Sequence, residues 1–479
     1  MKNLILLILS PLLIASCSTK SSQTNIPGGS QPNIILIMAD DLGYGDLACY
    51  GSSSIKTPNI DRLADKGMKF TDFHSNGMVC SPTRAALLTG KYQQRTGLSE
   101  VIAVRWHNGI GLNTEEETFA EILNSAGYKT AIFGKWHLGV EPEFNPTRQG
   151  FDEFIGFTAG NVDYHSHLNL KRELDWWKME KLADEPGYQT EIITRHAINY
   201  IKEADEQPFF LYLPFGAPHT PNQGPYSKVE RTPAGLSKAH QKNYADSINA
   251  TIPNPPKAYQ LPEDENEQFK QISIEMVEYL DASIGRIIDQ LVESNLANNT
   301  LVIFTSDNGP RKMLSAGPFR GGKGSLYEGG HHLPCIAVWP TKIEPGSISN
   351  ETIMSMDFLP TFAALSGASI PENLHIDGID LSDHLLNKKV LPERYCYWGK
   401  STGQAIRDGD WKLIRYENEN IELFNLAEDI NESNNLAEAN PDKVSQLSLE
   451  LEKWYDEVTK GVPQIIHHNE LRNRHQEVN

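Results

Sequence analysis

Short apolar runs alternate with longer amphipathic stretches over most of the chain. A continuous apolar run predicts a strand buried on both faces, whereas apolar residues three or four positions apart predict a helix with one buried face. The strand candidates are residues 33–39, 129–133, 208–214 and 301–306, and the helix candidates are residues 59–66, 81–88, 118–126, 190–204 and 268–293. Strands that alternate with helices are typical of an α/β fold, so we predict a large, mostly parallel sheet sandwiched by helices.

The pattern changes after about residue 380. Short strand candidates joined by tight turns lie at 395–398, 404–407, 411–415 and 422–425, and one amphipathic helix is predicted at 441–459. We therefore predict a large domain over residues 32–380 and a C-terminal α+β subdomain over 381–479, with a smaller antiparallel sheet and a packed helix. Residues 222–266, rich in Pro and Asn and without clear periodicity, are predicted to be a long surface excursion over the functional face.

The first residues have the pattern of an export signal. Lys2 precedes an apolar run at 4–15 that is too short to span a membrane as a mature helix. Small residues then precede Cys17, which resembles the bacterial lipoprotein signal; an ordinary secretory signal is the alternative. We predict a signal peptide over 1–17 with Cys17 lipidated, and a flexible tether over 18–31. The protein is then expected to be exported and held on a bacterial membrane, periplasmic or at the outer-membrane surface, by its lipid alone.

Charge and cysteine content exclude two classes of protein. Lys and Arg number 43 and Asp and Glu 62, which gives a formal net charge of −19. A surface of this sign repels phosphate backbones, so nucleic acid is not an expected partner. Five cysteines in 479 residues are too few for a disulfide scaffold, and we interpret Cys49, Cys335 and Cys396 as buried thiols.

Charged and metal-competent side chains follow every predicted strand of the large sheet. Asp40 and Asp41 follow the first strand, Lys135 and His137 the second, His219 the third, and Asp307 and Asn308 the fourth. Ligands of open parallel sheets bind beyond the carboxyl ends of the strands. We therefore expect these side chains to meet at one edge of the sheet and to form a functional site.

The acidic members of this set are hard oxygen donors. Three carboxylates and one amide, from Asp40, Asp41, Asp307 and Asn308, suit Ca²⁺ or Mg²⁺ better than Zn²⁺, because no His or Cys belongs to this set. A cation would also relieve the repulsion among three adjacent carboxylates. The alternative is a structural ion that only ties two loops together.

The most distinctive segment is residues 80–90, which read CSPTRAALLTG. Good helix formers followed by Gly90 predict a short helix whose N-terminus is at Cys80, where free N–H groups favour an anion. Arg84 falls one turn later and is placed to bind anionic oxygens with its forked guanidinium. The alternative is a small cysteine buried in a core helix.

This segment resembles the signature of the formylglycine-dependent sulfatases, a family with the alkaline phosphatase fold. The second family signature is matched by GKWHLG at 134–139. Further matches are DDLGYGD at 40–46, PH at 218–219, DNG at 307–309, RGGKGS at 320–325, YEGG at 327–330, AIR at 405–407, WKL at 411–413 and ELFNL at 422–426. The resemblance runs from about residue 33 to 454. One departure is visible, because His331-His332 stands where relatives have an arginine.

The resemblance implies that residues 32–380 are a catalytic domain. In such enzymes a maturation enzyme oxidises the signature cysteine, here Cys80, to formylglycine, whose hydrate attacks a sulfate ester. The implied cation is Ca²⁺ in preference to Mg²⁺, and its implied ligands are Asp40, Asp41, Asp307, Asn308 and the modified Cys80. The other implied roles are Arg84 to orient the hydrate, Lys135 and Lys323 to bind sulfate oxygens, His219 with Lys323 to protonate the leaving alcohol, and His137 to take a proton from the hydrate.

The leaving alcohol is expected to belong to a sulfated saccharide, of galactose or N-acetylgalactosamine type, in an external polysaccharide. Candidate substrate contacts are His165, His167, Trp176, Arg172, Arg311, Lys312 and Arg320, with packing or plain surface charge as the alternative for each. Two competing hypotheses remain open. One is a phosphatase, phosphodiesterase or phosphonate hydrolase of the same superfold, and the other is a non-catalytic glycan-binding lipoprotein.

Overall fold

A computed structural model describes residues 31–257 and 259–477. The predicted signal peptide with Cys17, and the tether except its last residue, lie outside the described residues. Within the described part of the chain, no helix combines the length and apolar character needed to cross a membrane.

The large domain is built on an eleven-stranded sheet with a parallel centre. The four central strands lie in the order β8 (Thr300–Ser306), β1 (Asn33–Ala39), β7 (Phe209–Pro214) and β3 (Lys129–Lys135), and all three pairings between them are parallel. These are the four strands that the apolar runs predicted. β4 (Glu153–Phe157) continues the parallel part beside β3. Because β8, β1, β7 and β3 are neighbours, the residues after them meet at one edge of the sheet.

The sheet is completed by strands that the sequence pattern did not predict. β9 (His332–Val338) runs antiparallel to both β8 and β2 (Met68–His74). The short strands are β10 (Ser347–Ser349) and β11 (Ile353–Met354) beside β2, and β5 (Trp177–Lys178) and β6 (Lys181–Leu182) at the opposite edge. The sheet is therefore mixed, with antiparallel strands flanking the parallel centre.

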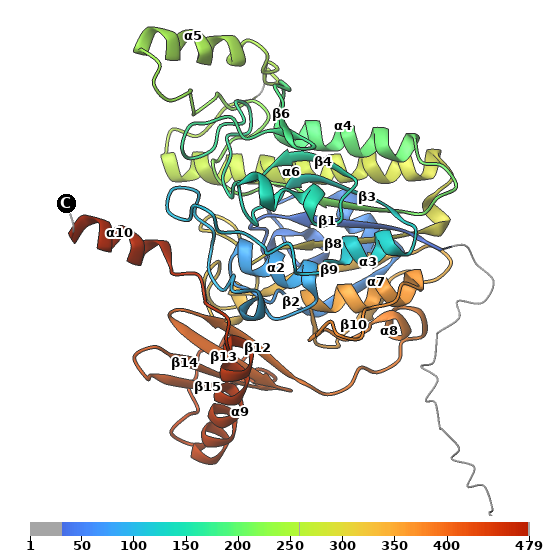
Figure 1. Ribbon diagram of the computed structural model, residues 1–479, viewed down its shortest axis with the longest axis vertical. Coiled ribbons are helices and arrows are strands. Elements are labelled where there is room, and N and C mark those ends of the chain that lie inside the picture. Colours follow the sequence, from blue (N-terminus) through green and yellow to red (C-terminus); the bar gives the residue numbers. More distant parts are fainter. Residues whose placement is uncertain (1–30, 258, 478–479) are drawn as a thin grey trace, which may run out of the picture.

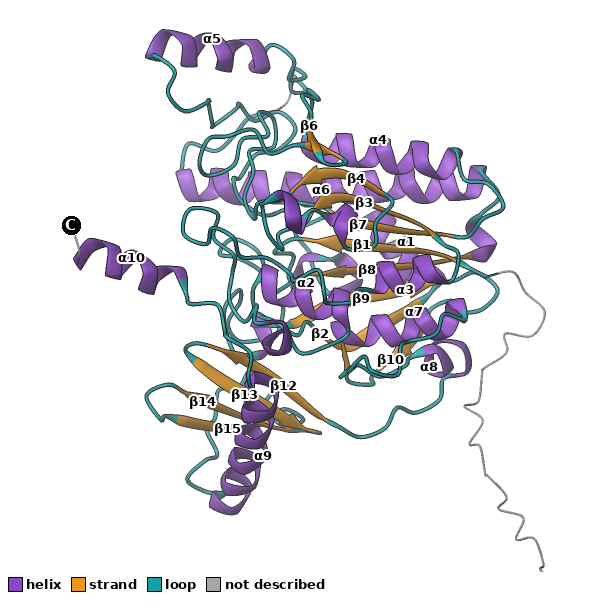
Figure 2. Ribbon diagram, in the orientation of Figure 1, coloured by secondary structure: helices purple, strands orange, loops and turns teal. Residues whose placement is uncertain are grey.

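Helices cover both faces of the sheet, as Figure 2 shows. On one face lie α1 (Pro58–Lys66), α4 (Gln189–Lys202) and the long α6 (Glu265–Glu293); on the other lie α2 (Cys80–Thr89), α3 (Phe119–Ser125), α7 (Phe358–Ser366) and α8 (Ser382–Asn387). Alternate residues of β1 supply the two cores: Ile34 and Leu36 pack on one side, Ile35 and Ile37 on the other. This alternation explains why the run at 33–39 is apolar throughout.

The C-terminal sheet is separate and antiparallel. Its strands β12 (Tyr395–Lys400), β13 (Gly403–Asp408), β14 (Trp411–Tyr416) and β15 (Ile421–Asn425) follow one another as a meander, and α9 (Pro441–Thr459) packs against them. Figure 1 shows this unit beside one end of the large sheet. Helix α8 lies within the range predicted for the C-terminal subdomain, but it packs against α7, and its Leu385 belongs to the core of the large domain.

Two further helices lie away from the large sheet. The excursion at 222–266 contains α5 (Lys238–Asn249), which has no buried residue and stands apart at the top of Figure 1. Helix α10 (His468–Glu477) also extends away from both sheets. The excursion begins three residues after His219, at Asn222. Its first turn is held to the large domain by Gln223, whose side-chain oxygen accepts a hydrogen bond from the Tyr164 amide (2.9 Å).

Candidate active site

The functional side chains are gathered at the carboxyl edge of the four central strands. Asp40 and Asp41 follow β1, Lys135 ends β3, His219 lies in the loop after β7, and Asp307 follows β8. Two functional residues have left-handed backbone, with φ of 69° at Asp41 and 58° at His137. Non-glycine residues in this region are uncommon and tend to occur at functional sites, where surrounding packing fixes a strained backbone.

Cys80 begins α2 and faces the aspartates. Its thiol is 3.6 Å from Asp40 Oδ1 and 3.3 Å from the Lys323 Nζ, and the residue is 2% exposed. Burial raises the pKa of the Cys80 thiol to about 12, although the charges of Lys135 and Lys323 act in the opposite direction. An unmodified Cys80 is therefore a neutral thiol and a poor nucleophile at neutral pH.

Lys135 and Arg84, both buried, bind Asp40 and Asp307. Lys135 Nζ donates to Asp40 Oδ2 at 2.5 Å. Arg84 donates from Nε (3.2 Å) and Nη2 (2.8 Å) to Asp307 Oδ2 and from Nη1 to the Lys135 carbonyl (3.0 Å). The guanidinium thus ties α2 to both β3 and β8. All ten residues of α2 are buried, so this helix is held rigidly against the edge of the sheet.

Asp41 shares its carboxylate among several groups. Lys323 Nζ donates to Oδ1 at 2.5 Å, and Asn308 Nδ2 donates to the same oxygen at 2.7 Å. Burial alone would raise the pKa of Asp41, but the charges of Lys323 and His219 hold it well below its usual range. Asp41 is therefore ionised in the folded protein.

The oxygen donors fit a hard cation. Asp41 Oδ2 and Asn308 Oδ1 are buried and have no hydrogen-bond partner among the described residues. Ligand atoms of Asp40, Asp41, Cys80 and His219 lie within 4.8 Å of one another. Orphaned buried oxygens are costly unless an ion or ligand satisfies them. The donor set, dominated by carboxylate and amide oxygens, is the kind that Ca²⁺ and Mg²⁺ prefer.

His137 is placed as a base. Its Nε2 lies 2.9 Å from the Ile102 carbonyl, which must accept a hydrogen bond, so Nε2 carries the proton. Its Nδ1 is buried without a hydrogen-bond partner among the described residues. Burial and then the charge of Lys135 hold the pKa of His137 well below its usual value. The imidazole is therefore neutral, with the Nδ1 lone pair free.

His219 faces Asp41 from the loop after β7. Its Nδ1 donates to the Thr220 carbonyl at 2.7 Å, and its Nε2 lies 3.7 Å from Asp41 Oδ2. The hydroxyl of Tyr164, 2.8 Å from the His219 carbonyl, supports the loop. Burial and then the charges of Lys323 and Lys135 hold the pKa of His219 well below its usual value.

The loop that carries Lys323 is held by the C-terminal sheet. Lys412 of β14 lies 2.8 Å from Glu328 Oε1 and 2.9 Å from Glu432 Oε1, and all three side chains are fully buried. Lys400 of β12 donates to the Gly324 carbonyl at 2.5 Å. The departure at 331–332 belongs to the same buried network, because Lys412 Nζ also lies 3.2 Å from His331 Nε2.

Three predicted substrate contacts are buried in the structure. Trp176 is fully buried and stacks on His167, with ring centroids 4.6 Å apart. His165 is 5% exposed, and its Nε2 lies 3.2 Å from the Gly224 carbonyl. His165 contacts the excursion at Gly224, whereas Trp176 and His167 stack on each other within the large domain. Their burial favours packing over sugar contact as the role of these rings. Their aromatic and polar character has a structural reason, which the sequence pattern alone could not distinguish from sugar binding.

The predicted arginine contacts divide differently. Arg320 stacks on the Tyr327 ring (3.8 Å) and donates to the Glu432 carbonyl (2.6 Å), so it serves the contact between the domains and its predicted substrate role is not supported. Arg172 is exposed and donates to the Thr232 carbonyl (2.7 Å); its role toward substrate stays a prediction. Arg311 does lie at the site, with Nε 3.9 Å from Asp41 Oδ2.

Sequence reasoning missed contributions made by backbone and by the second domain. The Ile102 carbonyl fixes the tautomer of His137, and no residue-type signal marks a carbonyl. Lys412 lies within the WKL segment that resembled the family, but its burial against the Lys323 loop required the structure. Around Cys80, this edge of the sheet therefore brings together basic side chains that can bind an anion, a neutral histidine that can accept a proton, and oxygen ligands that suit a hard cation.

Comparisons with known proteins match both domains. A family model described as Sulfatase matches residues 32–368, and one described as N-sulphoglucosamine sulphohydrolase, C-terminal, matches residues 322–460. Arylsulfatase A of Homo sapiens is 34% identical over 411 residues, covering 78% of this chain and 72% of that protein. N-acetylgalactosamine-6-sulfatase of Sus scrofa is 33% identical over 420 residues, covering 81% of this chain and 72% of that protein.

A solved structure agrees in fold. Ps i-CgsB, crystallised in complex with k-i-k-neocarrahexaose, superposes with a TM-score of 0.79 and is 30% identical, covering 94% of this chain and 98% of that one. The expected alkaline phosphatase-like architecture with a second antiparallel sheet is thereby confirmed. The chain belongs to the sulfatase family and is a sulfuric ester hydrolase.

Proposed function

We propose that this chain hydrolyses sulfate monoesters on a sulfated saccharide, with a formylglycine made from Cys80 as the nucleophile and Ca²⁺ as the cation. The observation that carries the proposal is the position of Cys80 at the start of buried helix α2, with Lys323 3.3 Å and Asp40 3.6 Å from its Sγ. A sulfur there is inert as a thiol, because burial raises its pKa to about 12. Modification would replace it by an oxygen nucleophile.

The formylglycine would supply the nucleophile, and the cation would neutralise charge. The hydrated aldehyde would provide an attacking oxygen, and Asp40, Asp41, Asp307 and Asn308 would hold the cation, which would offset negative charge. Lys135 and Lys323 bind sulfate oxygens and stabilise the charge that develops as the ester bond breaks. Arg84 holds Asp307 and the Lys135 segment in register.

Two histidines move protons in the proposed reaction. His219, with Lys323, gives a proton to the leaving oxygen; the negative ester nearby favours protonation of the imidazole. His137 receives a proton at Nδ1, the nitrogen that the Ile102 contact leaves free. Water and the ester thus yield an alcohol and sulfate.

The charges of the site support a divalent cation. Three carboxylates face three cations: Asp40, Asp41 and Asp307 against Lys135, Lys323 and Arg84. A divalent ion adds two positive charges to this balanced set. The sulfate monoester brings one negative charge and an ionised nucleophile brings another. The charge of the divalent ion is thus balanced by the ester and the nucleophile, which favours their binding together.

The relatives support a sugar as the alcohol. One relative is named an N-acetylgalactosamine-6-sulfatase, and the Ps i-CgsB structure contains a neocarrahexaose. We infer a galactose- or N-acetylgalactosamine-type sulfate ester in an external polysaccharide.

The proposal includes a formylglycine-generating maturation enzyme as partner, export of the protein, and a membrane anchor through lipid on Cys17. Labelling with a palmitate analogue tests the anchor, because Cys17→Ala should abolish the label.

Mass spectrometry and turnover test the mechanism together. The full chain, expressed with a maturation enzyme, is assayed for sulfate release from an aryl sulfate and from sulfated galactose and N-acetylgalactosamine, beside Cys80→Ala. We expect formylglycine at position 80, and activity in the modified protein alone. Full activity with an unmodified thiol would overturn the mechanism. Faster turnover of phosphate or phosphonate esters would favour the other hydrolase, and sugar binding without sulfate release after confirmed modification would favour a non-catalytic protein.

A further inference from the structure

A cleft beside catalytic Lys323 is lined by cations and contains no acid. It lies between the loops at 310–314 and 321–325 and has a volume of about 480 Å³. Its lining residues are Pro310, Arg311, Lys312, Leu314, Gly321, Gly322, Lys323 and Ser325. Three of these eight are basic, in a chain whose formal net charge is −19. A local positive cleft on an acidic molecule concentrates anions at that point.

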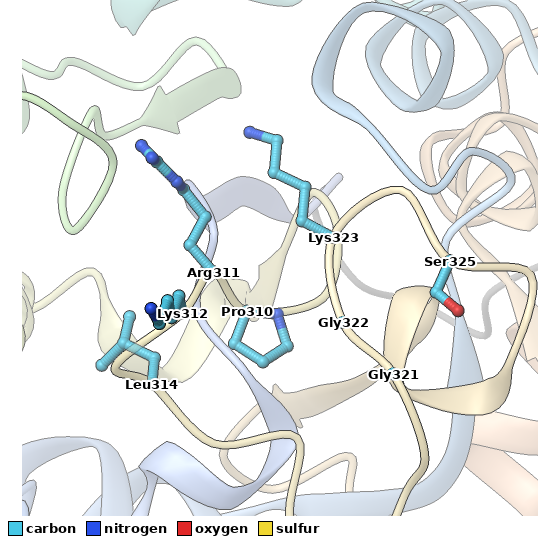
Figure 3. Close-up of a pocket in the computed structure, with 8 residues that line it drawn as sticks. All are labelled: Pro310, Arg311, Lys312, Leu314, Gly321, Gly322, Lys323 and Ser325. Carbon is cyan, nitrogen blue, oxygen red and sulfur yellow. The ribbon is translucent and has the colours of Figure 1, made fainter.

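Arg311 connects this cleft to the reaction site. Figure 3 shows the Arg311 and Lys323 side chains extending in the same direction from the two loops. They approach different oxygens of one buried carboxylate: Lys323 Nζ lies 2.5 Å from Asp41 Oδ1, and Arg311 Nε lies 3.9 Å from Oδ2. Arg311 also donates to the hydroxyl of Thr220, the residue after His219. A sulfate bound at Lys323 therefore lies near Arg311.

The charge of Arg311 is incompletely neutralised by Asp41. That carboxylate already accepts shorter hydrogen bonds from Lys323 and Asn308. The Arg311 side chain is 41% exposed, compared with 20% for Lys323, so its guanidinium has room for a second anion. Lys312, the next residue, is exposed and lines the same cleft. A forked guanidinium beside a flexible ammonium suits a carboxylate or a sulfate group.

The surface of the C-terminal sheet near Tyr327 has the opposite character. A second cleft there is lined by Tyr327, Thr402, Tyr416, Glu417, Asn418, Asn420 and Glu422, with two acids and no base. A chain of repeated anions is therefore attracted to the first cleft and not to this one.

We propose that Arg311 and Lys312 form a subsite for a second anionic group of the substrate, a sulfate ester or a uronic carboxylate near the sulfate that is removed. The inference rests on the proposed function and deepens it, because it selects multiply charged saccharides over singly sulfated ones. An ionic contact of this kind weakens as salt rises, since the groups are partly exposed.

Equilibrium binding to full-length Cys80→Ala protein in Ca²⁺ buffer tests the subsite without turnover. The probes are N-acetylgalactosamine 6-sulfate, its 4,6-disulfate, and a hexuronate–N-acetylgalactosamine 6-sulfate disaccharide. The two probes with a second anion should bind about 10-fold more tightly than the first, the value of one charge-assisted hydrogen bond. Comparison of the disulfate with the disaccharide shows whether sulfate or carboxylate is preferred.

Variants locate the effect. Arg311→Gln with Lys312→Gln should reduce the preference to about twofold or less, and Arg311→Lys with Lys312→Arg should retain most of it. The matched control is Lys342→Gln, an exposed lysine beyond β9 at the opposite edge of the sheet, which should leave the preference unchanged. Equal binding of all three probes, or a preference that survives the double Gln variant, would overturn the subsite. Sulfate release by wild type is measured separately, so failure of the proposed function is distinguishable.

Discussion

Gly134 shows how tightly backbone approaches the catalytic edge. It lies between Phe133 and Lys135 in β3 with φ of +134°, and a Cβ there would be 2.1 Å from the Pro214 carbonyl oxygen. Any side chain must push β3 away from β7. That shift would displace Lys135, whose ammonium lies 2.5 Å from Asp40.

We expect Gly134→Ala to lower the free energy of unfolding by about 2 kcal/mol or more and to reduce sulfate release sharply. Gly127→Ala is the matched control, because Gly127 has φ of +89° but nothing within 4 Å of its Cβ position. Its cost is the backbone strain alone, about 1 kcal/mol. Chemical denaturation and kinetics measure both. Equal effects at the two glycines would show that the close approach to Pro214 does not matter.

Lys323 contacts Cys80, the proposed position of the nucleophile, with its Nζ 3.3 Å from the sulfur. Burial alone would lower the pKa of Lys323, but Asp41 and Cys80 hold it well above the usual range, so the ammonium stays charged. We expect Lys323→Met to reduce kcat/KM for an aryl sulfate by about 100-fold, and Lys323→Arg to recover part of that loss because the charge is kept. Steady-state kinetics on protein with confirmed formylglycine measure both. Activity of the Met variant within about threefold of wild type would exclude the proposed role.

At the scale of elements, Lys412 of β14 links the two domains. Its ammonium is fully buried between Glu328 and Glu432. Burial alone would raise the pKa of Glu328, but Lys412 holds it well below its usual range, so the pair is ionic. Removal of the ammonium leaves two carboxylates without their cation in a dry interface.

We expect Lys412→Met to destabilise the protein by about 3 kcal/mol and to lower activity, because Glu328 belongs to the segment that follows Lys323. Lys443→Met is the control: that lysine of α9 is partly exposed and lies 3.3 Å from Asp408, so its loss should cost under about 1 kcal/mol. Thermal unfolding and sulfate release below the transition measure the two effects. A Met variant as stable as wild type would show that the buried network is not needed.

Elements were predictable where burial or turn chemistry left a local pattern. The four central strands and α9 were found within one or two residues, because each is either apolar throughout or strongly amphipathic. Strand β2 was missed because Asp72 and His74 interrupt its apolar pattern. The structure explains both, since Arg407 binds Asp72 at 2.8 Å and His74 lies 3.0 Å from His331. Partners far along the chain satisfy these groups, and local sequence does not contain that information.

The residues of the candidate site also differ in how far the sequence predicted them. Residues that follow strands, such as Asp41 and His219, were predictable because topology alone brings strand ends together. Trp176 and His167 were predicted to contact a sugar because a buried aromatic stack and a sugar platform use the same residue types. Only exposure separates the two, and exposure depends on tertiary packing that the local sequence does not show.

For the whole molecule, the buried groups His74 and Asp46 make the stability of the fold depend on pH in opposite directions. Burial lowers the pKa of His74 to about 4, whereas an unfolded histidine titrates near 6.5. Between these values the unfolded chain binds the proton and the folded one does not, so stability is full above about pH 6.5 and falls as the pH drops toward 4. Burial raises the pKa of Asp46 to about 7 from 3.8, so there the folded chain binds the proton and stability falls as the pH rises toward 7.

Single variants should separate these two contributions. His74→Gln removes a titration worth up to about 3 kcal/mol, so its stability relative to wild type should improve as the pH falls from 7.5 to 5. Asp46→Asn should change in the opposite sense, gaining relative to wild type as the pH rises over the same range. Unfolding free energies at the two pH values measure both slopes, and parallel pH profiles for wild type and His74→Gln would contradict the assignment.

Because His74 contacts Asp72 and His331 beside Arg407 and Lys412, acid should loosen the contact between the large domain and the C-terminal sheet first. Hydrogen exchange at β13 and β14 would then rise at pH 5 before exchange at β1 does.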